Sequence, residues 1–153
     1  MNILISACLL GLPTRYSGDG YPIPELEALI SAPGLHLVPV CPEQLGGLPT
    51  PRSPAERLGG RVITAEGEDV TEPYQQGAAC ALELARRLNC ECALLKARSP
   101  TCGSSVIYDG TFSHARIPGD GVAAEQLKKA GIPVFDEEHM AEFWAFMGKG
   151  EKL

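Results

Sequence analysis

Short apolar runs alternate with amphipathic stretches along most of the 153-residue chain. Runs of aliphatic and β-branched residues are typical of buried strands, whereas apolar residues at intervals of three and four predict helices. We expect strands at 2–7, 35–40, 62–64, 92–95 and 132–135, and helices at 24–31, 71–88, 119–130 and 138–147. Thr71 is the expected N-cap of the second helix, and Glu137 and Glu138 fit the start of the last one, where negative charge complements the helix dipole.

Strands that alternate with helices favour an α/β fold with a mostly parallel sheet and right-handed crossovers. We therefore predict a single three-layer domain over residues 1–153, Rossmann-like or flavodoxin-like, with no internal repeat or linker. In such sheets the ligand crevice lies beyond the carboxyl ends of the strands, where the strand order changes direction. The stretch 41–60 is rich in Pro and Gly and long for a loop without secondary structure, which favours a functional role.

Three of the six cysteines lie in loops that directly follow predicted strands. Cys8, Cys41 and Cys102 are far apart in the sequence, but the carboxyl ends of parallel strands meet at one edge of a sheet. Gly and Pro residues in these loops leave backbone amides free to hydrogen-bond the sulfides of a cluster. The pattern indicates three thiolate ligands of an iron–sulfur cluster, and three unrelated buried thiols are the alternative.

Other cysteine chemistries fit the sequence less well. A closed structural zinc site usually has paired local ligands, but the chain has no CxxC pair and only His114 lies near these loops. Three thiolates on a cubane cluster leave one iron without a protein ligand, and such an iron can act as a Lewis acid that binds a soft sulfur atom. A reactive-cysteine enzyme is the competing class, and it would use His36, His114 or His139 as its base.

The other three cysteines, Cys80, Cys90 and Cys92, lie in an apolar helical stretch and its exit, where free Cys behaves as a small hydrophobe. Cys90 and Cys92 would face the same side of a strand, which is a weak metal signal. The opening segment MNILISACLLGLP lacks the basic region of a secretion signal, so we interpret it as a strand. Six cysteines without an export signal then favour a reducing, cytoplasmic location.

The composition narrows the choice of partners. Hydrophobic residues make up 44% of the chain and charged residues 21%, which predicts a soluble globular protein, and no apolar run approaches the length of a membrane span. A net charge of −6 argues against nucleic-acid binding, which depends on Lys and Arg at phosphates. We expect a small-molecule substrate, no nucleic acid or membrane partner, and a monomer or homodimer.

Several longer motifs then point to a family. The runs ISACLLG, RYSGDG, VCPEQLGGLPTPRSPAE, GEDVT, LLKARSPTCGSSVIYDGTFS and GDGV follow one another between Ile5 and Ile132. In sequence and in order these motifs closely resemble those of the small bacterial family of thiouracil desulfurases, first catalogued as a domain of unknown function. The resemblance implies a [4Fe-4S] enzyme that desulfurates a thiolated pyrimidine such as 2-thiouracil to uracil and sulfide without net redox change. It also implies the same three cysteine ligands. Because such a cluster would be assembled on three separate loops, we expect that it can be lost in air.

The resemblance further implies two catalytic polar groups. Glu43 would help a water molecule to attack the thiocarbonyl carbon, and Ser99 would hydrogen-bond the substrate or relay a proton. One position departs from the family pattern, because Thr14 stands where members commonly carry Cys. Thr is a poor cluster ligand, so any contribution of that thiol to sulfur handling is lost here.

Cationic and aromatic residues near the cysteine loops are candidates for substrate binding. Arg52, Lys96 and Arg98 would balance the charge of a cluster or bind the carbonyl oxygens of a pyrimidine, and ordinary solvated cations are the alternative. Tyr108 and Phe112 would stack on a planar ring, unless they are packed aromatics.

Two other functions remain open from the sequence. A sulfur carrier or cluster-containing binding protein would hold sulfide for a partner, and Glu43 and Ser99 would then be dispensable. A metal-free nucleotide-binding domain of flavodoxin-like shape is the third class, but the chain has neither a GxGxxG nor a Walker motif.

Overall fold

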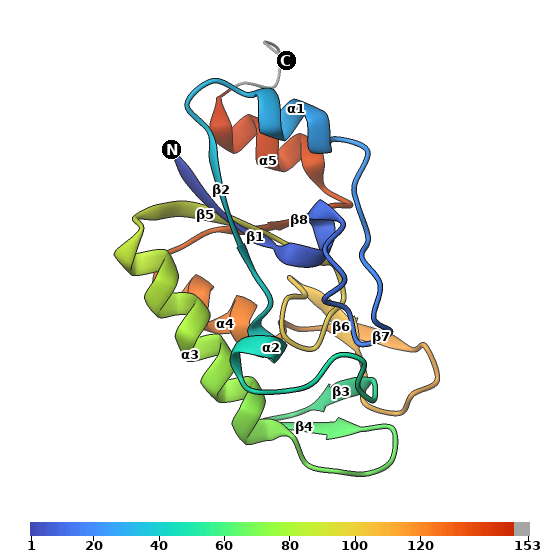
Figure 1. The fold of residues 1–153 in the computed structure, drawn as a ribbon. Helices are drawn as coiled ribbons and strands as arrows, with labels where there is room; N and C mark the ends of the chain where they lie inside the picture. Colours follow the sequence, from blue (N-terminus) through green and yellow to red (C-terminus); the bar gives the residue numbers. More distant parts are fainter. Residues whose placement is uncertain (149–153) are drawn as a thin grey trace.

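A four-stranded parallel sheet runs through the middle of the computed structural model, which describes residues 1–148 (Figure 1). The strand order β2-β1-β5-β8 matches the first four positions of a flavodoxin-like sheet. All three strand pairs are parallel, so the predicted α/β class with a mostly parallel sheet is confirmed. The strands are β1 (Asn2–Ser6), β2 (His36–Val40), β5 (Cys90–Leu95) and β8 (Val134–Asp136).

Helices cover both faces of this sheet and complete the three layers that the sequence predicts. Figure 1 shows α1 (Leu26–Ser31) and α5 (Met140–Met147) on one face, and α3 (Thr71–Arg87) and α4 (Val122–Lys129) on the other. Because side chains alternate along a strand, one β1 face packs with α1 and α5 and the other with α4 and α3. No helix within residues 1–148 combines the length and the apolar character needed to cross a membrane.

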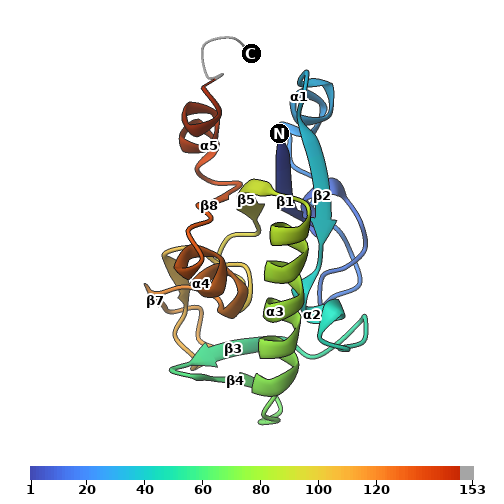
Figure 2. The ribbon, with the colours of Figure 1, turned by 90° about the vertical axis from the view of Figure 1, so that its left-hand side faces the viewer.

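Two small antiparallel hairpins extend beyond the carboxyl ends of the sheet strands. One joins β3 (Ala55–Leu58) to β4 (Arg61–Thr64), and the other joins β6 (Val106–Tyr108) to β7 (Arg116–Pro118). Figure 2 shows α3 running alongside the sheet and down to the β3–β4 hairpin. The prediction of a structureless loop at 41–60 is therefore wrong, because this stretch contains β3 and the short helix α2 (Pro42–Leu45).

The ends of two helices differ from their predicted form. Thr71 begins α3 rather than capping it, since its Oγ1 accepts a hydrogen bond from the backbone N–H of Val62. The amide of Thr71 instead donates to the carboxylate of Asp69 at 2.9 Å. The last helix starts at Met140, so Glu137 and Glu138 precede it, and the prediction that they open this helix is wrong.

A bulge in β5 separates two cysteines that the sequence places on one face. In the pairing with β1, Asn2 lies opposite Cys90 and Ile3 opposite Cys92, so the register shifts by one residue at Glu91. Cys90 consequently packs in the apolar cluster on the α3–α4 face and Cys92 in the cluster on the α1–α5 face. The expectation that both face the same side is therefore wrong.

Candidate active site

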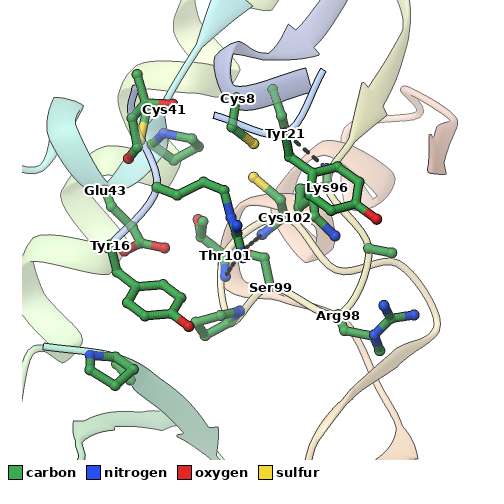
Figure 3. A pocket seen from close by; sticks show the side chains of 18 of the residues that line it. Cys8, Tyr16, Tyr21, Cys41, Glu43, Lys96, Arg98, Ser99, Thr101 and Cys102 are labelled. Carbon is green, nitrogen blue, oxygen red and sulfur yellow. Dashed lines mark hydrogen bonds between the residues drawn. The ribbon is translucent and has the colours of Figure 1, made fainter. Parts of the chain in front are cut away.

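Three thiols from three strand ends line one cavity of about 440 Å³ (Figure 3). Cys8 lies in the 3-10 turn Ala7–Leu10 that directly follows β1, Cys41 lies between β2 and α2, and Cys102 lies in the loop after β5. None of them is in a disulfide. The expected gathering of these residues at one edge of the sheet is confirmed.

Burial makes two of these thiols weaker acids than a free cysteine. Burial raises the pKa of Cys8 to about 11, although the nearby Lys96 ammonium acts in the opposite direction. Burial also raises the pKa of Cys102, despite a hydrogen bond to Ser6 that favours the thiolate. A reactive nucleophile requires a lowered pKa, and no hydrogen bond among residues 1–148 joins a cysteine to a histidine. The geometry therefore argues against a Cys–His nucleophile.

The donor set fits an iron–sulfur cluster. Within residues 1–148, no three Cys, His, Asp or Glu groups lie close enough together to hold a single metal ion. Three separated thiols around one cavity instead match a cluster, in which each thiolate binds a different iron. Polar groups surround them. Arg52 Nη2 lies 3.9 Å from Cys41 Sγ. Among the described residues 1–148, the buried Thr101 hydroxyl, next to Cys102, finds no hydrogen-bond partner.

Glu43, on the first turn of α2, is fixed by two buried side chains. Arg52 Nε donates to Glu43 Oε1 at 2.7 Å, and the two side chains are only 7% and 13% exposed. Burial raises the pKa of the Tyr74 hydroxyl, and the neighbouring charge and hydrogen bonding of Glu43 raise it further, so Tyr74 remains protonated beside this carboxylate. Arg52 and Tyr74 together give the Glu43 carboxylate one defined orientation at the cavity.

Close packing of backbone on backbone sets the position of α2. A Cβ atom on Gly77 of α3 would lie 1.8 Å from the carbonyl oxygen of Pro42, and one on Gly46 would lie 2.0 Å from the carbonyl oxygen of Pro73. Only glycine allows the start of α2 to approach α3 this closely. This contact fixes the segment that carries Cys41 and Glu43.

Ser99 organises the loop that carries Cys102. Its Oγ accepts hydrogen bonds from the amides of Thr101 and Cys102 at 3.1 and 3.0 Å, which Figure 3 draws as dashed lines. The Ser99 carbonyl also accepts from Gly103 at 2.8 Å. Because both side-chain contacts use its lone pairs, the Ser99 hydroxyl proton is available to a group in the cavity.

The predicted cationic residues line the cavity, but each already has a carboxylate partner. Lys96 Nζ lies 2.6 Å from Glu137 Oε2, and both side chains are largely buried. Glu137 Oε1 also accepts from the Ala97 amide at 2.7 Å. Arg98 Nη1 contacts both oxygens of Glu138 at 2.5 and 2.6 Å. Glu137 and Glu138 therefore anchor the cysteine-bearing loop.

The structure adds an aromatic group that sequence reasoning missed. Tyr16 and Tyr21 line the cavity with partly exposed rings, and the Arg15 guanidinium lies 5.7 and 5.6 Å from their centroids. Lys96 Nζ lies 4.5 Å from the ring centroid of Tyr21. Arg15, Tyr16 and Tyr21 fall in or directly after the RYSGDG motif, so this motif was the available sequence signal for them.

The remaining predicted positions divide between the cavity and the rest of the fold. Tyr108 and Thr14 line the cavity, and the carbonyl of Thr14 accepts from Arg52 Nη2 at 2.8 Å. Thr14 thus contributes its backbone carbonyl to the cavity. Away from the cavity, Cys80 is exposed on α3, and burial raises the pKa of Cys92 to about 12.

Comparisons with known proteins agree with the motif resemblance. A family model described as 2-thiouracil desulfurase matches residues 3–139. The uncharacterized protein YbbK of Bacillus subtilis (strain 168) is 43% identical over 148 residues, which cover 90% of this chain and 97% of that protein. A solved structure described as the [4Fe-4S]-dependent thiouracil desulfidase TudS is 42% identical, with a TM-score of 0.90 over 96% of this chain and 97% of its own.

Proposed function

Because this chain belongs to the 2-thiouracil desulfurase family, we propose that it is a [4Fe-4S]-dependent enzyme that removes sulfur from a thiolated pyrimidine such as 2-thiouracil. The products are uracil and sulfide. Water supplies the oxygen that replaces sulfur on the ring carbon, and no electrons are gained or lost. The observation that carries the proposal is one cavity lined by Cys8, Cys41 and Cys102 together with Glu43 and Ser99.

We assign the three cysteines as the cluster ligands. When bound, such a cluster supplies an iron with no protein ligand, which can act as a Lewis acid toward a soft sulfur atom. The chain contributes the negative thiolates and the cations around them. Arg52 lies beside the Cys41 sulfur, and Lys96 lies close enough to Cys8 to favour its charged form. These cations offset part of the negative charge that the ligands bring into a buried site.

Glu43 is the proposed general base. Arg52 and Tyr74 hold its carboxylate at the cavity, where it can accept a proton from the attacking water. Ser99 is the proposed donor to the substrate, because its hydroxyl proton is not used within the loop. Holding base and donor on rigid segments provides the orientation that the reaction requires.

The substrate-binding residues are proposed to act mainly through shape and charge. Lys96 and Arg98 contribute positive charge at the cavity wall, although their carboxylate partners leave neither as an isolated cation. Tyr108 contributes a ring to the same wall. We also propose that residues 1–153 act as one domain, in a reducing cytoplasmic compartment that keeps the six cysteines as free thiols.

The test is anaerobic turnover of 2-thiouracil by the reconstituted protein, with uracil and sulfide quantified in the absence of any electron donor or acceptor. We expect equal amounts of both products, and a kcat lowered about 10²- to 10⁴-fold in Glu43→Gln and Ser99→Ala. Glu68→Ala, an exposed carboxylate on the β4–α3 connection, is the control. A sulfur carrier would retain full sulfide transfer in both active-site variants, and that result would overturn the hydrolytic assignment.

A further inference from the structure

The turn between β6 and β7, residues 109–115, also lines the cavity, and the proposed function gives the residues of this turn no role. Phe112 and His114 in this turn line the cavity, and Tyr108 joins them from the end of β6. Phe112 is 38% exposed, so its ring is not part of the core. A ring at this place offers a flat apolar face to the contents of the cavity.

The backbone of this turn adopts a conformation that side chains rarely take. The φ angles are +57° at Phe112 and +65° at His114, in the left-handed region that favours glycine. A glycine at position 112 would relieve the steric strain of the Phe112 Cβ atom. Such a conformation persists only when surrounding contacts hold it, and it often occurs at ligand-binding sites.

One carboxylate on the other hairpin supplies such contacts. Glu56, on β3, accepts hydrogen bonds from the backbone amides of Gly110 and Phe112 at 3.0 and 3.1 Å, both through Oε1. Hydrogen bonds to an ionised carboxylate are about twice as strong as neutral ones. The two hairpins lie side by side in Figure 1, and a Cβ atom on Gly110 would lie 3.0 Å from Leu58 Cδ1. The turn therefore rests directly on β3.

We propose that Glu56 is a positioning residue, which holds the turn at residues 109–115 so that the ring of Phe112 stacks on the planar substrate and sets its affinity. This inference rests on the proposed function, since a heteroaromatic ring is the ligand that an aromatic wall recognises. The Glu56 oxygen that makes both contacts is occupied by amides of the turn. Glu56 also lines the cavity, and its two hydrogen bonds to the turn are the means by which we assign it an effect on the substrate through Phe112.

Steady-state kinetics of the reconstituted enzyme with 2-thiouracil test the proposal. Phe112→Ala and Glu56→Ala should each raise KM about three- to tenfold, the range of one aromatic stacking contact, with kcat nearly unchanged. Glu56→Gln keeps an oxygen that can accept from both amides, so it should restore most of the wild-type KM. The double variant should be no worse than Phe112→Ala alone, because the two residues act as one unit. Glu68→Ala is the control.

Hydrogen exchange at the Gly110 and Phe112 amides gives a readout that needs no turnover. Glu56→Ala should exchange faster at both amides, whereas Glu56→Gln and Phe112→Ala should stay near wild type. The proposal is overturned if exchange is unchanged in Glu56→Ala, if the two KM effects multiply in the double variant, or if kcat falls at constant KM. Absence of wild-type turnover would refute the proposed function alone. In that case, the exchange rates and the dissociation constant of 2-thiouracil from equilibrium dialysis would decide the inference.

Discussion

At the scale of single residues, the sequence predicts which side chains carry the chemistry, but it does not predict which residues those side chains contact. Cys8, Cys41 and Cys102 stand out because each follows a strand, and backbone topology alone brings strand ends together. The partners of Arg52 and Lys96 are not predictable in the same way. Each cation meets a carboxylate through tertiary packing, and the 41-residue separation of Lys96 and Glu137 leaves no local signal.

The guanidinium of Arg52 orients Glu43, and a substitution of Arg52 tests whether this orientation matters for turnover. This guanidinium contacts Glu43 Oε1, the carbonyls of Thr14 and Pro49, and the Thr50 hydroxyl at 2.7–3.1 Å. A single ammonium cannot reproduce this planar set of contacts, so Arg52→Lys should lose the orientation of Glu43. We expect kcat to fall about 10- to 100-fold while KM changes little, measured by sulfide release.

The matched control for Arg52→Lys is Arg61→Lys, in the exposed ion pair with Asp69. It should leave kcat unchanged, because exposed pairs contribute little and this one lies outside the cavity. Equal activity of Arg52→Lys and the wild type would show that Glu43 needs no fixed orientation.

At the scale of elements, the long periodic segments were predictable and the short hairpins were not. The helix expected at 71–88 forms at Thr71–Arg87, because an apolar stripe over many turns is a strong signal. The strand β3 has no fully buried position, so it lacks the alternation that marks a half-buried strand. The β5 bulge is also invisible in the sequence, because it arises from pairing with β1.

The buried ion pair Lys96–Glu137 joins the β8–α5 connection to the loop that carries Cys102. Its contribution to stability can be measured as a change in the free energy of unfolding. Glu137→Ala leaves the Lys96 ammonium, 14% exposed, without its partner and removes the acceptor of the Ala97 amide. We expect the free energy of unfolding in urea to fall by about 3 kcal/mol. The neighbouring Glu138→Ala breaks a pair whose carboxylate is 46% exposed, and it should cost less than about 1 kcal/mol. Equal losses in the two variants would contradict this anchoring role.

His139 makes a small part of the stability depend on pH. A hydrogen bond from its Nδ1 to Asp136, at 2.7 Å, raises the pKa of His139 above 6.5, and the charges of Asp136, Glu142 and Glu138 act in the same direction. Lys128 of α4 lines the surface groove that His139, Asp136 and Glu142 also line, and its positive charge acts in the opposite direction. Because the pKa is higher in the folded state, the contribution is fully present below about pH 6.5 and is lost as pH rises through the folded-state pKa.

Urea unfolding of the wild type and His139→Gln at several pH values measures this effect. The difference in unfolding free energy between the two proteins should be larger at pH 5.5 than at pH 8.5. It should amount to only a few tenths of a kcal/mol, because the imidazole is mostly exposed. A difference that grows with pH would refute the assigned sign.

At the scale of the whole molecule, strand order determines where chemistry can occur. The chain runs from β1 to β2 on one side and then to β5 on the other, so the direction of strand order changes at β1. Cys8 follows β1, and Cys41 and Cys102 follow its two neighbours. The crevice at this switch point is where open α/β sheets bind their ligands. The fold class and the cysteine set were therefore predictable together, whereas the hairpin walls of the cavity required the structure.

The iron and acid-labile sulfide content after anaerobic reconstitution shows directly whether Cys8, Cys41 and Cys102 hold a cluster. The measurement compares the wild type with Cys8→Ser, Cys41→Ser and Cys102→Ser, and with Cys80→Ser as the exposed control. We predict about four irons per chain and a visible absorption band in the wild type and the control, and loss of most iron in each of the other three variants. A wild type that binds no iron, or a Cys102→Ser protein that keeps a full cluster, would contradict the central claim.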